Sequence, residues 1–296
     1  MIRRILTVGL FLAGACLLAG CIDSETRVVI KADGGGTVTE TVYVARQMER
    51  LLTIMASSVT DTSDGGSPAW KRGLNRALFR QRAQRMGEGV KLTGFKEVQN
   101  RTGGKGYEAV YEFADINTLT LSTEPLCPSP TFREASAAAT NAFAPGRLVT
   151  FAFSRDGDPS LKINLPWPDE MRRQAVALRE TMQGDGARLS REDLALLRHV
   201  FGGFRARMVV TTMTDIEQTN AAYVERGFGP SRHTEVLLYD LNLGEVVHNE
   251  PAAARLAAIG AASDVHEALA KYFQLPGVRV EARNPVTMSL RPKPGR

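Results

Sequence analysis

Cysteine is scarce in this chain of 296 residues, which holds only Cys16, Cys21 and Cys127. The first two lie in or beside an apolar N-terminal segment, so Cys127 would be the single thiol in the rest of the chain and could form no disulfide within it. The folded part must then be stabilised by a hydrophobic core, which a chain of this length can build. Cys127 is followed by Pro128 and has no base or cation beside it in the sequence, which favours a structural cysteine over a catalytic thiol.

Sequence motifs for metal binding and catalysis are also missing. The histidines show no H-x-x-x-H or H-E-x-x-H spacing, and there is no G-x-S-x-G nucleophile elbow. The glycine clusters Gly34–Gly36 and Gly103–Gly106 lie in predicted hairpin turns rather than between a strand and a helix, which argues against phosphate-binding loops. We therefore expect no metal, no cofactor and no enzymatic activity, with a hydrolase whose residues converge only in space as an alternative. The four histidines are His199, His233, His248 and His266.

The chain has neither a strong charge surplus nor a long apolar run. Its formal net charge is +5 at pH 7 and its aromatic residues are scattered, so a nucleic-acid-binding surface is not indicated. The apolar stretch near the N-terminus, Ile5–Ala19, is shorter than the about 20 residues that a membrane-spanning helix needs. The composition is otherwise that of a globular protein, with 43% hydrophobic and 23% charged residues.

What is present begins with an export signal. Arg3 and Arg4 precede the apolar stretch, and Leu18-Ala19-Gly20-Cys21 follows it, which is the layout of a secretory signal peptide. The tetrapeptide resembles the lipobox of bacterial lipoproteins; a plain signal peptide with an accidental cysteine is the alternative. The resemblance implies cleavage before Cys21, a diacylglycerol thioether on its sulfur and acylation of the new amine, and two or more acyl chains give stable anchoring. By resemblance to the usual sorting rule, Ile22 after the cysteine favours the outer membrane over the inner one.

Hairpins and amphipathic helices alternate along the remainder of the chain. Strand-like segments flank Asp33–Gly36, Asn100–Gly106 and Asp156–Asp158, each of which supplies turn residues. A break in the apolar alternation around Gly94 predicts a β-bulge. We predict the α+β class, with an antiparallel sheet built from hairpins and amphipathic helices packed on one face.

A stretch rich in Pro, Ala and Ser suggests a boundary inside the chain. Residues 122–146 show little periodicity, and segments of that length are usually functional loops or linkers. We therefore predict a signal peptide at 1–20, an N-terminal α+β subdomain at 21–121, a linker at 122–146 and a C-terminal α+β subdomain at 147–296.

One predicted helix, Trp70–Met86, stands out because it carries several cations and no acidic residue. A basic amphipathic helix can lie on a membrane with its cations against anionic headgroups, each contributing about 1 kcal/mol. The alternative is a helix packed on the core, with a solvated arginine face. The candidate membrane-surface residues are Trp70, Lys71, Arg72, Arg76, Arg80 and Arg82.

The order of elements after Cys21 is a short strand, a Gly-rich turn, a second strand and an amphipathic helix. Later, the aromatic strand Tyr107–Phe113 runs into an acidic turn at Asp115. This layout resembles the LppM-type lipoprotein domain of bacterial envelopes, mainly over residues 21–121. The resemblance implies an α+β domain at the membrane surface that binds lipid or glycolipid and catalyses nothing. Family members typically end in a membrane helix, whereas Arg291–Arg296 is basic and has no apolar span.

Together these features predict a lipid-anchored, non-enzymatic envelope protein that faces the periplasm. Its expected partners are the membrane, through the acyl anchor on Cys21, and either anionic lipid or glycolipid or an envelope protein. An assembly or scaffold protein with an exposed apolar patch is the second hypothesis.

Overall fold

The computed structural model describes residues 22–45, 76–122, 148–155, 158–166, 202–226, 233–253 and 272–291, with isolated helical positions at 192, 194, 195, 198 and 255. The export signal with Cys21, all but the first residue of the predicted linker, and Trp70, Lys71 and Arg72 lie outside the described residues.

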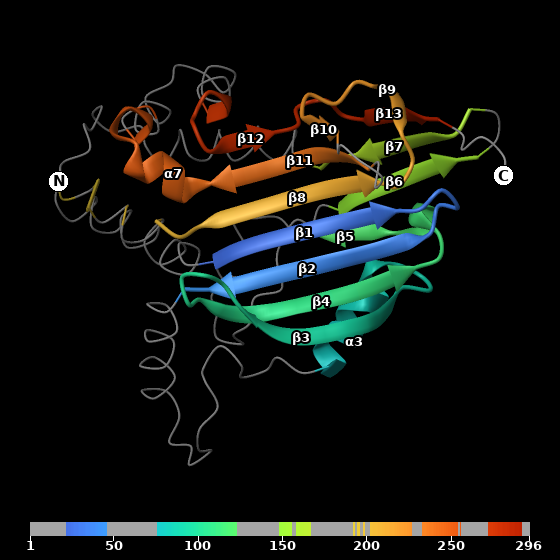
Figure 1. Cartoon of the computed structure of the whole chain (residues 1–296), viewed down its shortest axis with the longest axis horizontal. Helices are drawn as coiled ribbons and strands as arrows, with labels where there is room; N and C mark the ends of the chain where they lie inside the picture. The colour runs from blue at the N-terminus through green and yellow to red at the C-terminus, as the bar shows by residue number, and fades with distance from the viewer. Residues whose placement is uncertain are drawn as a thin grey trace, which may run out of the picture.

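Two β-sheets dominate the described chain, and we name them sheet A and sheet B (Figure 1). Sheet A has the strand order β10-β11-β8-β1-β2-β4-β3, with β12 paired to a second part of β11. Sheet B has the order β5-β6-β7-β13-β9. The strands of sheet A are β1 Ile22–Ile30, β2 Gly36–Val44, β3 Lys91–Gln99, β4 Lys105–Phe113, β8 Arg205–Thr212, β10 Val224–Arg226, β11 Thr234–Asn242 and β12 Val278–Val280. The strands of sheet B are β5 Thr120–Ser122, β6 Leu148–Ser154, β7 Ser160–Asn164, β9 Ile216–Thr219 and β13 Val286–Leu290. The helices are α3 Arg76–Met86 and α7 Leu243–His248, and a 3-10 helix spans Ile116–Thr118.

All three predicted hairpins are confirmed: β1 pairs with β2, β3 with β4, and β6 with β7, each antiparallel. In the first turn, Gly34 has a φ of 77°, a conformation that favours glycine, and the Asp33 carboxylate accepts the Gly35 N–H. The predicted bulge is also present, because the β3–β4 register shifts between Leu92 and Gly94.

The pairing of β1 with β8 joins distant parts of the sequence. The two strands are parallel, from Asp23 opposite Arg205 to Ile30 opposite Thr212. Sheet B likewise joins β5, which precedes most of the predicted linker, to β6, which follows it. Strands from both predicted subdomains therefore share backbone hydrogen bonds in both sheets, and their described parts do not pack as separate units.

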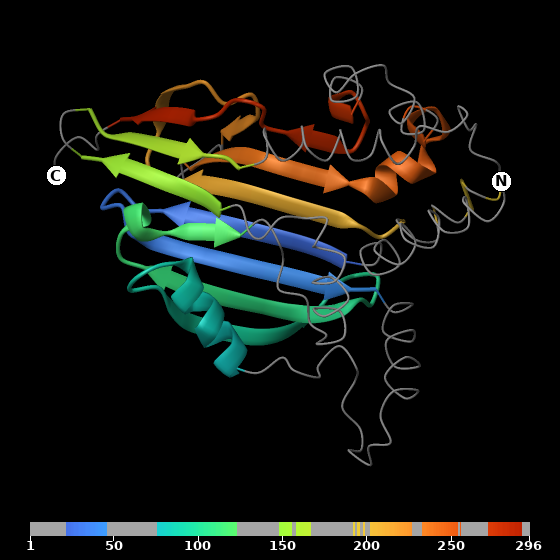
Figure 2. The same ribbon diagram turned by 180° about the vertical axis from the view of Figure 1, so that it is seen from behind.

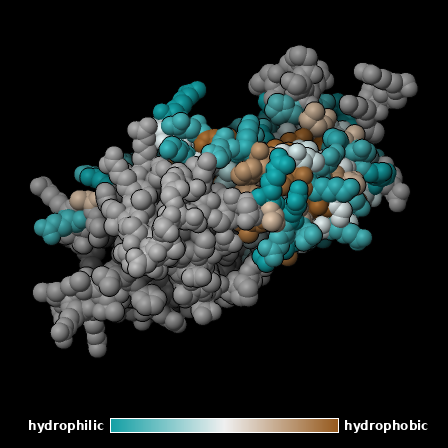
Figure 3. Space-filling view, turned by 90° about the horizontal axis from the view of Figure 1, so that it is seen from below, coloured by the Kyte–Doolittle hydropathy of each residue, from teal (hydrophilic) through white to brown (hydrophobic). Residues whose placement is uncertain are grey.

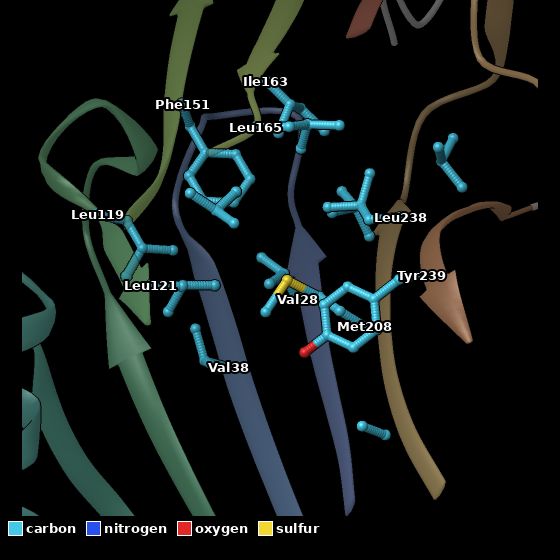
Figure 4. Packing of buried hydrophobic residues seen from close by; sticks show 14 of the residues in the cluster. Val28, Val38, Leu119, Leu121, Phe151, Ile163, Leu165, Met208, Leu238 and Tyr239 are labelled. Atoms are coloured by element: carbon cyan, nitrogen blue, oxygen red, sulfur yellow. The ribbon is translucent and has the colours of Figure 1, made fainter. Parts of the chain in front are cut away.

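The hydrophobic core lies between the two sheets. Alternate residues of each strand point inward, among them Val28 and Val38 of sheet A and Phe151 and Ile163 of sheet B, and these belong to one continuous cluster. Figure 4 shows these side chains pointing into a common space, together with Met208. Full burial of a side chain of this size contributes about 1.5–3 kcal/mol, so the joint between the sheets is a major source of stability.

The fold is α+β, as predicted, but strands dominate it. The prediction that amphipathic helices pack on one face of an antiparallel sheet therefore needs correction. The inner face of sheet A packs largely against sheet B, and α3 is the described helix that packs against β3 and β5 (Figure 2). Sheet A is also not wholly antiparallel, because of the β1–β8 pair. The physical reason is that β6 and β7 carry their own apolar face, with Val149 and Leu161 buried, and this face covers the area that the prediction assigned to helices.

Candidate functional site

The basic helix predicted from the sequence is present as α3, whose described part starts at Arg76. Its buried residues are Phe79, Ala83 and Met86, which lie three or four positions apart and so share one face. At about 100° per residue, Arg76 and Arg80 lie on one side of the helix and Arg85 on another. The exposed cations of α3 are Arg76, Arg80 and Arg85.

The direction of α3 across sheet A follows from its contacts. We call the end of sheet A that holds Ile22 the near end, on the left in Figure 1, and the opposite end, with the turn Lys31–Gly35, the far end. The Phe79 ring lies 4.9 Å from that of Tyr107, the third residue of β4, close to the near end. The Met86 carbonyl accepts a hydrogen bond from Thr120 Oγ1 at 3.2 Å, beyond the far end of β4. Arg76 therefore lies toward the near end.

Two further contacts fix α3 in place. The Phe79 ring also packs on Phe95 of β3, with centroids 4.6 Å apart, so the helix is wedged against an aromatic cluster. After the helix, Gly87 has a φ of 144°, and a Cβ there would lie 2.1 Å from the Thr118 carbonyl oxygen. A backbone approach this close excludes any side chain at this position.

Arg82 differs from the other arginines of α3 because its guanidinium is buried against Glu40 of β2. Arg82 Nε lies 2.9 Å from Glu40 Oε1 and 2.7 Å from Oε2, and Nη2 bonds Oε1 as well. Their side chains are 14% and 4% exposed. Burial alone lowers the pKa of Arg82, but the charge and hydrogen bonds of Glu40 outweigh this and hold that pKa above its ordinary value. Arg82 therefore stays charged and joins α3 to the sheet.

Two tyrosines complete the buried cluster around Glu40. The Tyr111 hydroxyl donates to Glu40 Oε2 at 3.3 Å. Burial raises the pKa of Tyr111 above its ordinary value, and the Glu40 charge adds to the effect. Burial followed by the Glu40 charge also raises the pKa of Tyr239. Both phenols stay neutral, so the arrangement is a charged pair that accepts one hydrogen bond from the neutral Tyr111 hydroxyl, a combination suited to holding elements together.

Glu40 was missed by the sequence analysis, although a signal for it exists. It lies in phase with Val38 and Val42 on the buried face of β2, where every second residue is buried. A carboxylate at such a position requires a partner, and α3 is the basic element that follows. The sequence does not show which of its arginines supplies that partner.

The near end of sheet A begins directly after the predicted lipidation site. Ile22, the first residue of β1, pairs with Val44 of β2, and Asp23 is already paired with Tyr43 on one side and Arg205 on the other. The folded sheet therefore starts one residue after Cys21.

The outer face of sheet A, which faces the viewer in Figure 1, carries an ion-pair network. Asp240 accepts hydrogen bonds from Arg205 and Arg279, each at 2.9 Å. Glu25 accepts from Arg207 at 3.0 Å and from Arg27, which also pairs with Glu235. These charges compensate one another, and the Asp240 carboxylate at the centre of one group is itself buried, which indicates a structural role for the network.

The described histidines have ordinary surroundings. His248 Nδ1 lies 2.7 Å from the Gly244 carbonyl within α7, and His233 lies 3.8 Å from Glu235. His199 and His266 lie outside the described residues. Within the described ranges, no three His, Cys, Asp or Glu residues are grouped so that they could hold a metal ion.

The surface on the side of β3 and α3 is mixed in polarity. Figure 3 shows mainly hydrophilic residues there, with apolar areas between them. In the part of the chain that the structure describes, no helix has the length and apolar character needed to cross a membrane.

The comparisons with known proteins give little support beyond this geometry. No family model matches the sequence, and no curated protein sequence matches it. Among solved structures, the chain is similar to the folded domain of the Mycobacterium tuberculosis LppM protein, determined by NMR. The alignment has 11% identity and a TM-score of 0.26, and covers 74% of this chain and 91% of that chain. A likeness at this TM-score carries no argument about function.

Proposed function

We propose that this chain is a lipid-anchored, non-enzymatic protein of the bacterial envelope that faces the periplasm, at the outer membrane rather than the inner one. In this proposal, acyl groups on Cys21 anchor the near end of sheet A, and cations around α3 bind anionic lipid or glycolipid on the same membrane. No catalytic role is assigned, because the sequence carries no nucleophile, base or metal-ligand motif.

The observation that carries the proposal is the missing spacer between Cys21 and β1. One residue spans at most about 3.6 Å of chain. Ile22 is already paired with Val44, so acyl chains on Cys21 would bring the near end of sheet A into the headgroup region.

The exposed cations of α3 support the lipid-binding part. Arg76 and Arg80 lie on the half of α3 nearer to Ile22, and their side chains are exposed, unlike that of Arg82. Trp70, Lys71 and Arg72, which precede α3, stay predicted members of the same surface. Tethering raises the effective concentration of the bilayer around these cations, so weak electrostatic contacts would suffice.

The anchor is tested by metabolic labelling with radioactive palmitate. We expect label in the wild-type protein and in the control Cys127→Ser, and none in Cys21→Ala, which should also leave the membrane fraction. Equal labelling of Cys21→Ala, or unchanged fractionation of that variant, would show that Cys21 is not the anchor.

Lipid binding is tested with the unacylated Cys21→Ser chain and vesicles of neutral or anionic phospholipid. Loss of two cations that each contribute about 1 kcal/mol predicts binding about 30-fold weaker for Arg76→Glu/Arg80→Glu on anionic vesicles. Arg85→Glu, an exposed charge reversal at the other end of the same helix, is the matched control and should have a smaller effect. Equal binding to both vesicle types, or an equal effect of Arg85→Glu, would contradict the assignment.

A further inference from the structure

The turn between β3 and β4 projects from the near end of sheet A. Asn100 organises it: its Oδ1 accepts the Gly104 N–H at 2.7 Å and the Thr102 hydroxyl at 2.8 Å. The Asn100 backbone also bonds Gly104 and Gly103, at 2.9 and 3.0 Å. The backbone of this turn is therefore fixed, and the side chains of Arg101, Thr102 and Lys105 are exposed on it.

The strand register puts this turn level with the predicted anchor. Ile22 pairs with Val44, Val44 with Lys105, and Lys105 with Gln99, so one line crosses β1, β2, β4 and β3 at the near end. With strands about 4.8 Å apart, the turn lies about 10–14 Å to the side of β1. A flat surface that touches Cys21 and runs across the near end would also touch this turn.

The charges at the two ends of these four strands differ. The turn carries Arg101 and Lys105, and the closest exposed acid along β3 is Glu97. At the far end of the same strands, exposed acids and bases balance. The acids are Asp33, Glu88, Glu112 and Asp115, and the bases are Lys31, Arg85, Lys91 and Arg155, of which Arg155 lies beside Gly34. An anionic surface therefore favours the near end, where the turn carries two cations.

From these observations we propose that the β3–β4 turn, through Arg101 and Lys105, binds phosphate groups of anionic phospholipid beside the acyl anchor. Anchor and turn together hold the strands of sheet A upright on the bilayer, with the turn Lys31–Gly35 pointing away from it. A guanidinium can engage a phosphate with two hydrogen bonds, and an ammonium binds it as a point charge. This inference rests on the proposed anchor at Cys21.

The test uses the full acylated chain carrying Cys127→Ser, in vesicles that contain anionic phospholipid and a headgroup-attached nitroxide quencher. A fluorophore is attached at Thr102→Cys, or at the matched far-end position Lys31→Cys. We expect quenching at position 102 to exceed that at position 31 by about threefold or more, since the two positions lie at opposite ends of strands that are about 30 Å long. Equal quenching at the two positions, or stronger quenching at position 31, would overturn the proposal.

Charge variants test the role of the two cations. Arg101→Gln/Lys105→Gln should lower quenching at position 102 about twofold or more on anionic vesicles, whereas Lys91→Gln, at the far end of β3, should leave it unchanged. No effect of the double substitution, or undiminished quenching on neutral vesicles, would overturn the phosphate contact. Co-sedimentation distinguishes failure of the proposed anchor from failure of the proposed turn contact. A chain that does not sediment with vesicles would overturn both proposals. A chain that sediments but shows no quenching at position 102 would overturn only the contact between the turn and the lipid.

Discussion

Arg82 of α3 donates hydrogen bonds to both carboxylate oxygens of Glu40 on β2, at 2.9 and 2.7 Å, although the two residues are 42 positions apart. The pair is largely withdrawn from solvent and accepts a further hydrogen bond from the Tyr111 hydroxyl. A buried ion pair costs desolvation energy on both sides, and removing one partner leaves the other charge buried without compensation.

Removing Arg82 should therefore destabilise the fold strongly. Arg82→Met leaves the Glu40 carboxylate buried without its charge partner, and we expect the free energy of unfolding to fall by about 3–5 kcal/mol. The double variant Arg82→Met/Glu40→Gln should recover a large part of this loss, because no unpaired charge remains. Urea unfolding of both variants measures the difference, and a double variant as unstable as Arg82→Met would show that the charge of Glu40 is not the cause.

Two aspartates on the outer face of sheet A, Asp240 and Asp23, should make the free energy of unfolding depend on pH in opposite directions. Burial alone would raise the pKa of Asp240, but the hydrogen bonds and charges of Arg205 and Arg279 outweigh it and hold that pKa below its ordinary value of 3.8. Burial raises the pKa of Asp23 above the same value, despite the opposing charge of Arg205. The ionised form is thus favoured by folding at Asp240 and disfavoured at Asp23.

The direction in which each substitution changes the stability follows from the coupling of protonation to folding. A lowered folded pKa contributes stability above pH 3.8 that is lost as the pH falls through the folded pKa, so Asp240→Asn should cost about 1 kcal/mol at pH 7 and progressively less below pH 4. A raised folded pKa has the opposite sign, so Asp23→Asn should increase stability at pH 7, with the gain vanishing in acid. Urea unfolding between pH 3 and 8 checks both, and a destabilised Asp23→Asn at neutral pH would contradict the second.

Glycines of the β3–β4 hairpin should differ sharply in their tolerance of a methyl group. A Cβ on Gly106 would lie 1.7 Å from the Val42 carbonyl oxygen, a backbone atom, so Gly106→Ala must separate β4 from β2. A Cβ on Gly94 would meet only the Val110 side chain, at 3.3 Å. We expect Gly106→Ala to cost more than about 3 kcal/mol and Gly94→Ala less than about 1 kcal/mol. Thermal unfolding of the two variants distinguishes them, and similar melting temperatures would argue against the close approach at Gly106.

Local patterns in the sequence were enough to predict the hairpins. The turn residues Asp33–Gly36 and the alternation on either side specify β1 and β2, because register and facing in a hairpin depend on neighbours in sequence. The break at Gly94 specified the bulge for the same reason. The basic character of α3 is likewise visible in its composition, although its hydrophobic spacing does not say which arginine turns inward.

Contacts between distant segments could not be derived in this way. The β1–β8 pair joins segments about 180 residues apart, and each strand alone is compatible with many partners. The pairing of strands from both sides of residues 122–146 was likewise not visible in the sequence, because a compositional change marks a loop and does not show whether its flanks pack together.

The sequence by itself determined the hairpins, the basic helix and the resemblance to a lipobox at Cys21, because each of these depends on residues close together in the chain. Only the tertiary structure decided that two sheets share one core, that Arg82 faces Glu40 while Arg76 and Arg80 face solvent, and that the β3–β4 turn lies level with Ile22. These relationships arise from burying two apolar sheet faces against each other, and that choice of partners is made by packing across the whole chain rather than by any local pattern.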